Sequence, residues 1–309
     1  MRRTVAPTIA LCLLSPLLSR ADETASAPVA PATFWQSWNW DWLILFNLTL
    51  LALAYAMGWN QLRIKTGRKS ATRISRNQLA AWFLALAVLF VALISPLHAL
   101  SEELAAAHML QHMLIMVVAA PLFVFGSPGQ VLLFSMDSHW RPSVARWSRT
   151  FSLRAFAGLL WPWLLHAATL WFWHWPPAYQ AALADPLVHD AQHLSFFAAA
   201  CVYWRGIVDP VYRYRLQPLT ALGSLFATSL QAMLLGIFLA LSPDIWYEAY
   251  RWRTEAWNLT PLADQQLAGF LMWMPACLVY PALAALVLGH WLQRMSSAPG
   301  HRQPGQGGI

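Results

Sequence analysis

The chain has 309 residues, of which 58% are hydrophobic and only 11% are charged, and it contains 19 tryptophans. Soluble domains carry about 25% charged residues, so this composition excludes an ordinary soluble protein and indicates an integral membrane protein. A formal net charge of +7 would suggest a nucleic-acid partner in a soluble chain. Because the basic residues fall between apolar segments, we interpret them as topology signals and expect a lipid bilayer and no nucleic acid.

The amino-terminal residues have the pattern of a secretory signal peptide. A basic start precedes an apolar stretch over residues 5–18, and the small residue Ala21 fits a cleavage site. This stretch is shorter than the roughly 20 residues that a helix needs to cross a bilayer. We therefore predict a cleaved signal peptide over residues 1–21 and a periplasmic tail over residues 22–39, with an uncleaved first helix as the alternative.

Seven further apolar segments follow, each close to the length of a membrane span. They cover residues 40–59, 79–97, 108–125, 156–173, 191–208, 219–241 and 267–291. Inside lipid, an open segment satisfies its own backbone hydrogen bonds only as a helix. The sequence therefore predicts an all-α polytopic protein, with a seven-helix membrane domain over residues 40–293 and a disordered cytoplasmic tail over residues 294–309.

The distribution of charge sets the orientation of this predicted bundle. Every second connection is basic, and its cations are Arg63, Lys65, Arg68, Lys69, Arg73 and Arg76, then Arg141, Arg146, Arg149 and Arg154, then Arg205, Arg213 and Arg215. The connections between them are acidic or mixed in charge. Basic connections stay in the cytoplasm, so we predict an outside amino terminus and a cytoplasmic carboxyl terminus. A cleaved export signal requires the same orientation.

Histidines gather at the outer ends of the predicted helices. They are His98, His108, His112, His174, His189 and His193. Four of them form two pairs with the same four-residue spacing, His108/His112 and His189/His193. A four-residue step on a helix returns a side chain to nearly the same face, about 6 Å along the axis, so each pair can converge on one ligand. Because imidazole is the commonest metal ligand, the sequence predicts a metal site here.

Met116 refines the choice of metal, because it continues the stripe of His108 and His112 down one helix face. Imidazole with thioether suits copper(I), whereas few carboxylates lie nearby for calcium or manganese. Zinc more often recruits thiolate or carboxylate, and the three cysteines form no C-x-x-C motif. A non-metal role stays open for each residue type: the histidines would hydrogen-bond to carbonyls or lipid headgroups, and Met116 would only fill space in the core. Asp264, before the last segment, is either a helix N-cap or a functional carboxylate.

Two other functions are compatible with a histidine-rich membrane bundle. A haem-binding redox cytochrome would need facing histidines on different helices with a ring-sized gap, whereas the four paired residues lie at one predicted depth. A copper transporter would be expected to have repeated halves and interrupted helices at mid-membrane, and we find no such symmetry. A Soret band would favour the first alternative, and copper uptake into vesicles would favour the second.

Several motifs together resemble the CtaG family, membrane proteins associated with assembly of caa3-type cytochrome c oxidase. The motifs are His108-Met-Leu-Gln-His112-Met-Leu, Ala120-Pro121-Leu122, Gly126-Ser-Pro128, Trp171-Phe-Trp-His174-Trp-Pro176 with Tyr179, His189-x-x-x-His193, and Asp264-Gln-Gln-Leu-Ala-Gly-Phe-Leu-Met-Trp273. The resemblance covers residues 40–291, nearly the whole predicted membrane domain. In combination and in this order the motifs are specific.

The resemblance implies a non-enzymatic assembly factor in the bacterial cytoplasmic (inner) membrane. Its partners would be cytochrome c oxidase subunits, with a periplasmic copper chaperone as a further candidate. The predicted copper(I) ligands are His108, His112, His189 and His193, with His98, His174 and Met116 in support. The family pattern also implies an acidic residue just before His193, where this chain has Gln192. That departure would weaken the support of the second histidine pair.

Overall fold

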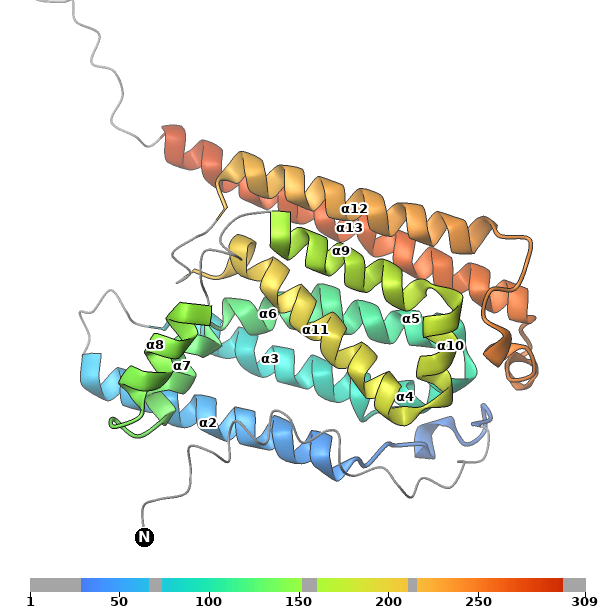
Figure 1. Cartoon of the computed structure of the whole chain (residues 1–309), viewed down its shortest axis with the longest axis horizontal. Helices are drawn as coiled ribbons and strands as arrows, with labels where there is room; N and C mark the ends of the chain where they lie inside the picture. The colour runs from blue at the N-terminus through green and yellow to red at the C-terminus, as the bar shows by residue number, and fades with distance from the viewer. Residues whose placement is uncertain (1–28, 67–73, 152–159, 211–215, 297–309) are drawn as a thin grey trace, which may run out of the picture.

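The computed structural model describes residues 29–66, 74–151, 160–210 and 216–296, and the regular elements in these ranges are all helical (Figure 1). This confirms the predicted all-α class. The predicted signal peptide over residues 1–21 lies outside the described residues, and so do residues 297–309 of the predicted tail.

The first half of the chain supplies a short 3-10 turn and a series of helices. They are η2 Phe34–Gln36, α2 Trp42–Thr66, α3 Arg76–Leu93, α4 Pro96–Glu103, α5 Ala105–Met113, η3 Leu114–Ala119, α6 Ala120–Phe125, α7 Pro128–Ser135 and α8 Arg141–Phe151. Elements α5, η3 and α6 follow one another without a break and form one continuous rod.

The second half of the chain begins with two helices joined by a short corner and ends with the longest helix. Its elements are α9 Leu160–His174, α10 Pro176–Ala184, α11 Pro186–Val208, α12 Pro218–Leu241, η4 Glu248–Tyr250, η5 Thr254–Trp257 and α13 Pro261–Ser296. Each of the seven predicted segments contributes a helix. The histidine-bearing helices α5 and α11 both begin about one turn before their first histidine, so each pair lies inside its helix.

Among the described residues, five helices are long and apolar enough to cross a membrane. They cover Trp42–Ile64, Arg76–Leu93, Ala105–Phe125, Pro218–Leu241 and Pro261–Gln293. The other two predicted spans correspond to α9, which has 15 described residues, and α11, which carries Asp190 and Arg205 beside its histidines. The protein is therefore a multi-pass membrane protein.

A π-helical turn, η3, interrupts the α-helical bonding of the rod between α5 and α6. Pro121 lies just beyond this turn and lacks the N–H group that would bond to the carbonyl of Val117. Turns of this kind inside α-helices are frequent at functional sites. The step from His112 to Met116 therefore runs from the α-helical part of the rod into the π-helical turn.

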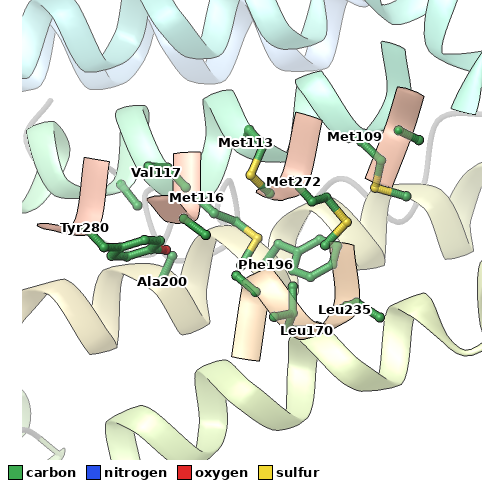
Figure 2. Packing of buried hydrophobic residues seen from close by; sticks show 14 of the residues in the cluster. Met109, Met113, Met116, Val117, Leu170, Phe196, Ala200, Leu235, Met272 and Tyr280 are labelled. Atoms are coloured by element: carbon green, nitrogen blue, oxygen red, sulfur yellow. The ribbon is translucent and has the colours of Figure 1, made fainter. Parts of the chain in front are cut away.

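The helices pack around two adjoining hydrophobic clusters. The larger one joins α5, α9, α11, α12 and α13 around a row of methionines, which Figure 2 shows from close by. The second one lies among α2, α3 and α7 and contains the stacked rings of Tyr55 and Trp82. Glycine permits the close contact of α12 with α13, because a Cβ atom on Gly269 would lie 2.5 Å from the carbonyl oxygen of Gly236.

Candidate metal centre

The paired histidines of α5 and α11 meet in the space between these two helices. α11 packs closely on η3 and α6 but less closely on α5, and histidine rings lie in between. The ring centroids are 4.3 Å apart within the His108/His112 pair and 4.4 Å apart within the His189/His193 pair. Across the helices, His108 lies 5.2 Å from His189, and His112 lies 5.3 Å from His193. All four side chains are buried, so the two pairs form one cluster.

Three members of this cluster have a spacing suited to a metal ion. One ligand atom from each of His108, His189 and His193 lies within 4.8 Å of the others. Metal–nitrogen bonds of about 2.0–2.1 Å would place two ligands of one ion at most roughly 4.2 Å apart, so binding requires only a small contraction. Imidazole ligands suit transition metals such as copper and zinc rather than calcium or magnesium.

His112 adds a second sign of a ligand site. Its side chain is fully buried, and in the described part of the chain neither ring nitrogen has a hydrogen-bond partner. A buried polar group without a partner costs about 1–3 kcal/mol, so such groups call for an explanation. A metal ion accepting the nitrogen lone pair would provide one. The residues present therefore fit a metal ion.

Hydrogen bonds fix the orientation of the His108 ring. Its Nδ1 lies 3.2 Å from the Tyr250 hydroxyl, which donates to the carbonyl of Ser101 at 2.9 Å. Burial raises the pKa of Tyr250 well above its ordinary value, so the hydroxyl keeps its proton. With that proton given to Ser101, the Tyr250 oxygen accepts from His108 Nδ1–H. In this tautomer Nε2 of His108 carries the lone pair that a metal requires. Because Gln192 Oε1, 3.3 Å from Nε2, cannot accept from a lone pair, the Gln192 amide must then turn its N–H group toward Nε2 in the metal-free protein.

Gln192 lies beside His108, which belongs to the other histidine pair. Its Oε1 is 3.3 Å from His108 Nε2, and its amide nitrogen is buried without a hydrogen-bond partner among the described residues. From the sequence, we expected residue 192 to affect the support of His193, the next residue along α11. The structure instead joins the two helices through Gln192.

Asp264 determines where α5 begins. It lies in the first turn of α13, and its carboxylate accepts hydrogen bonds from the backbone N–H groups of Ala105 at 2.7 Å and Ala106 at 3.1 Å. α5 has Leu104 at its N-cap position and therefore no side-chain cap of its own. A carboxylate at a helix amino terminus also interacts favourably with the helix dipole. Asp264 is thus an N-cap, but for the histidine-bearing helix α5.

His98 and His174 flank the cluster on opposite sides. The His98 ring lies 5.6 Å from that of His189, and its Nδ1 is 3.2 Å from the Gln111 amide nitrogen. The His174 ring lies 6.3 Å from that of His112. All six histidines predicted at the outer ends of the helices therefore belong to one connected group.

The methionines are arranged differently from the predicted stripe. Met116 is buried in the larger hydrophobic cluster, and its backbone carbonyl accepts a hydrogen bond from the Trp204 indole at 2.9 Å. The sulfur atom of Met109 lies 3.3 Å from Nε2 of His174. In Figure 2, Met109 is at one end of the row, Met272 lies next to it, and Met113 and Met116 lie beyond. The thioether in contact with a histidine is that of Met109.

A groove between α2 and α11 reaches the cluster from the side. It has an empty volume of about 800 Å³, and His193, Asp190 and Phe197 line it from α11. The α2 side contributes Ile44 and Asn47. His193 therefore faces both this groove and the histidine cluster.

Sequence reasoning missed three features of this centre. Tyr250 lies in the connection between α12 and α13, and no local pattern marks it as a partner of His108. Met109 does not share the helix face of the histidine pair, so the spacing pointed to Met116 instead. Gln111 stands next to His112 in the sequence and contacts His98, and its place inside the histidine motif was the one available signal.

The fold and the site define a class: a multi-pass helical membrane protein with a buried histidine cluster that can hold a metal ion. The family model described as cytochrome c oxidase caa3 assembly factor (Caa3_CtaG) matches residues 53–294. The chain belongs to this family, which confirms the resemblance found in its motifs.

Curated relatives come from mycobacteria. Uncharacterized proteins of Mycobacterium bovis and Mycobacterium tuberculosis are each 27% identical over 260 residues, which cover 80% of this chain and 38% of theirs. A protein of Mycobacterium leprae is 24% identical over 279 residues, covering 82% of this chain and 40% of its own length. The chain thus spans about two fifths of the curated relatives it matches. No solved structure shows a significant match.

Proposed function

We propose that this protein is a membrane assembly factor that binds copper(I) at the histidine cluster and passes it to a cytochrome c oxidase subunit. The family description supports the oxidase as the object of assembly. The observation that carries the metal proposal is the buried trio of His108, His189 and His193, with ligand atoms within 4.8 Å of one another. The ring nitrogens of His112, which have no hydrogen-bond partner among the described residues, support it further.

The proposed binding group is the full set predicted from the sequence. Its centre consists of His108, His112, His189 and His193, and its outlying members are His98, His174 and Met116. Copper(I) is favoured over zinc because the surroundings offer imidazole and thioether groups but no thiolate cluster. This role is binding and transfer, without catalysis.

The proposed topology places the cluster at the periplasmic face of a bacterial cytoplasmic membrane. In this topology α9 and α11 also cross the bilayer, giving seven spans with the amino terminus outside. The alternation of basic and acidic connections along the sequence supports it. A metal site at that face can exchange copper with a periplasmic chaperone or with an oxidase subunit.

The chain's own residues would make the site exchangeable. Tyr250 orients His108 so that Nε2 offers a lone pair, and Asp264 fixes the helix that carries both His108 and His112. Bound copper(I) would contribute only its charge and its preference for soft ligands. The groove beside His193 gives incoming and outgoing ligands a path to the ion. A cluster with more imidazoles than one ion needs allows stepwise ligand exchange.

Copper(I) binding to purified protein in detergent tests this proposal. We expect stoichiometric binding by the wild type, measured by competition with a chromophoric chelator, and its loss when all four paired histidines are replaced by alanine. His166→Ala is the matched control, because His166 is equally buried with partnerless ring nitrogens but stands apart on α9. Copper binding that survives the fourfold replacement would sink the proposal, and a Soret band would favour haem instead.

A gene deletion tests the role in assembly. If the protein delivers copper, the deletion strain should retain the oxidase subunit while the copper content of that subunit falls. If the amount of the subunit falls while the remaining subunit keeps its normal copper content, the protein instead acts as a scaffold that stabilises the subunit. The two quantities are measured on the same membranes by metal analysis and by immunoblotting.

A further inference from the structure

We propose that the cluster holds two copper(I) ions side by side, and that Met109, His174 and His112 form the second site. This inference rests on the proposed function, because it takes copper(I) as the cargo. The first ion belongs to the trio of imidazoles, His108, His189 and His193. The second site has a different donor set, two imidazoles and one thioether.

The tautomer of His174 provides the first argument. Its Nδ1 lies 2.7 Å from the carbonyl oxygen of Leu170, and a carbonyl oxygen can only accept. Nδ1 therefore carries the proton, and in the neutral ring Nε2 carries a lone pair. The Tyr247 hydroxyl also donates to the backbone carbonyl of His174 at 3.0 Å, which holds this helix end in place.

The neighbour of that lone pair provides the second argument. The sulfur of Met109 lies 3.3 Å from His174 Nε2, and a thioether has lone pairs but no proton to donate. Two lone-pair donors thus face each other in a buried site. A nitrogen ligand at about 2.0 Å and a sulfur ligand at about 2.3 Å from one metal ion can be separated by such a distance. A soft cation between them would turn a poor contact into two bonds.

His112 supplies the third ligand. It lies three residues after Met109 on α5, so the two side chains are neighbours on the helix surface. Its ring is 6.3 Å from that of His174, and both ring nitrogens are buried without hydrogen-bond partners in the ranges described. Its ring also lies 4.3 Å from that of His108, a member of the imidazole trio. His112 thus stands between the two sites, where an ion can change ligands one at a time.

Stoichiometry and X-ray absorption on the full-length protein in detergent test this inference. We expect the wild type to bind two copper(I) ions with a copper–sulfur distance of about 2.3 Å in the absorption spectrum. Met109→Leu should bind one ion and lose the sulfur signal. Met113→Leu is the matched control, since Met113 is also buried in the same rod, and it should keep both ions and the signal.

Both methionine-to-leucine replacements are nearly isosteric, so the fold is retained, which tryptophan fluorescence can verify. His174→Asn provides a second variant that should also bind one ion without sulfur ligation. Two ions and an unchanged sulfur signal in Met109→Leu would overturn the second site. A wild type that binds one ion without a sulfur signal would also overturn the second site, but it would leave the proposed function intact. A wild type that binds no copper would overturn the second site and the proposed function together.

Discussion

The two sides of the histidine cluster differ in their surroundings, although α5 contributes residues to both. Around His108 the neighbours are polar, with the Tyr250 hydroxyl and the Gln192 amide within hydrogen-bonding distance. Around His174 the neighbours are less polar: the ring of Phe196 lies 6.1 Å away, and the Met109 sulfur of α5 lies 3.3 Å from Nε2. The histidine rings on the two sides of the cluster therefore have different environments. Residues outside α5 create much of this difference.

This difference has a chemical consequence for the proposed transfer of copper(I). On the polar side, the groove lined by His193 reaches the imidazole trio, which assists exchange. An apolar environment excludes water and favours the soft, weakly hydrated ion and its thioether ligand. We infer that an ion on the His108 side exchanges with partners, whereas one on the His174 side is retained.

The largest expected effect is on the polar side. His108→Ala removes the ring that contacts both pairs, so binding at the imidazole trio should weaken by more than the roughly 100-fold expected for a supporting residue. The sulfur-ligated ion should remain, because its ligands are intact. Competition titration measures the affinity, and the X-ray absorption signal of sulfur reports the second ion. Equal loss of both ions in His108→Ala would show that the two sides are one site.

The next prediction concerns the free energy of unfolding and Asp264, the residue that caps α5. Asp264→Ala removes two charge-assisted hydrogen bonds at the helix start, and we expect the free energy of unfolding to fall by about 3 kcal/mol. Asp185→Ala is the matched variant on α11, where the cap is local and exposed, and it should cost about 1 kcal/mol. Denaturant unfolding followed by tryptophan fluorescence measures both. A cost for Asp185→Ala as large as that for Asp264→Ala would contradict the unequal anchoring of the two helices.

Hydrogen bonding to the His108 ring should affect affinity rather than folding. Tyr250→Phe keeps the aromatic ring but removes the hydroxyl that lies 3.2 Å from Nδ1, and we expect copper affinity to fall by about 10-fold. Tyr247→Phe is the control on the other side, because its hydroxyl bonds to the backbone of His174 and not to its ring. That variant should bind copper with nearly unchanged affinity. If the two variants behave alike, the orientation of the His108 ring is not set by Tyr250.

The helical period accounts for what the sequence could predict of this site. Spacing of four residues placed each histidine pair on one face, and the order of the spans placed both pairs, with His98 and His174, at one end of the bundle. The all-helical class followed from the apolar segments. These are local properties, and the geometry of a single helix is enough to derive them.

Contacts between distant elements account for what the sequence could not predict. Asp264 caps a helix that begins 159 residues earlier in the chain, and no local pattern names its partner. Met109 meets His174 only because α9 packs beside the bundle core. Each of these contacts depends on how helices pack against one another. The periodicity of a single helix carries no information about that packing.

The smallest expected effect is that of a new negative charge beside His108 on the copper affinities of the two sites. Gln192→Glu replaces a neutral amide with a carboxylate beside His108, at the position where the family pattern implies an acid. A negative charge near a bound cation should raise the affinity of the imidazole trio by about fivefold, an effect reduced by the cost of burying the carboxylate. The sulfur-ligated ion lies farther away and should be affected less. Titration of the two ions separately measures both changes.

The same variant also distinguishes two roles for the amide. If Gln192 serves only to fill the space between α5 and α11, the carboxylate should lower the stability of the metal-free protein and copper(I) should restore it, so that the melting temperature rises more on copper addition than in the wild type. If instead the amide must donate a hydrogen bond to His108, Gln192→Glu should weaken copper binding. A decrease in affinity would therefore contradict the expectation and make Gln192 a positioning residue whose amide group the site requires.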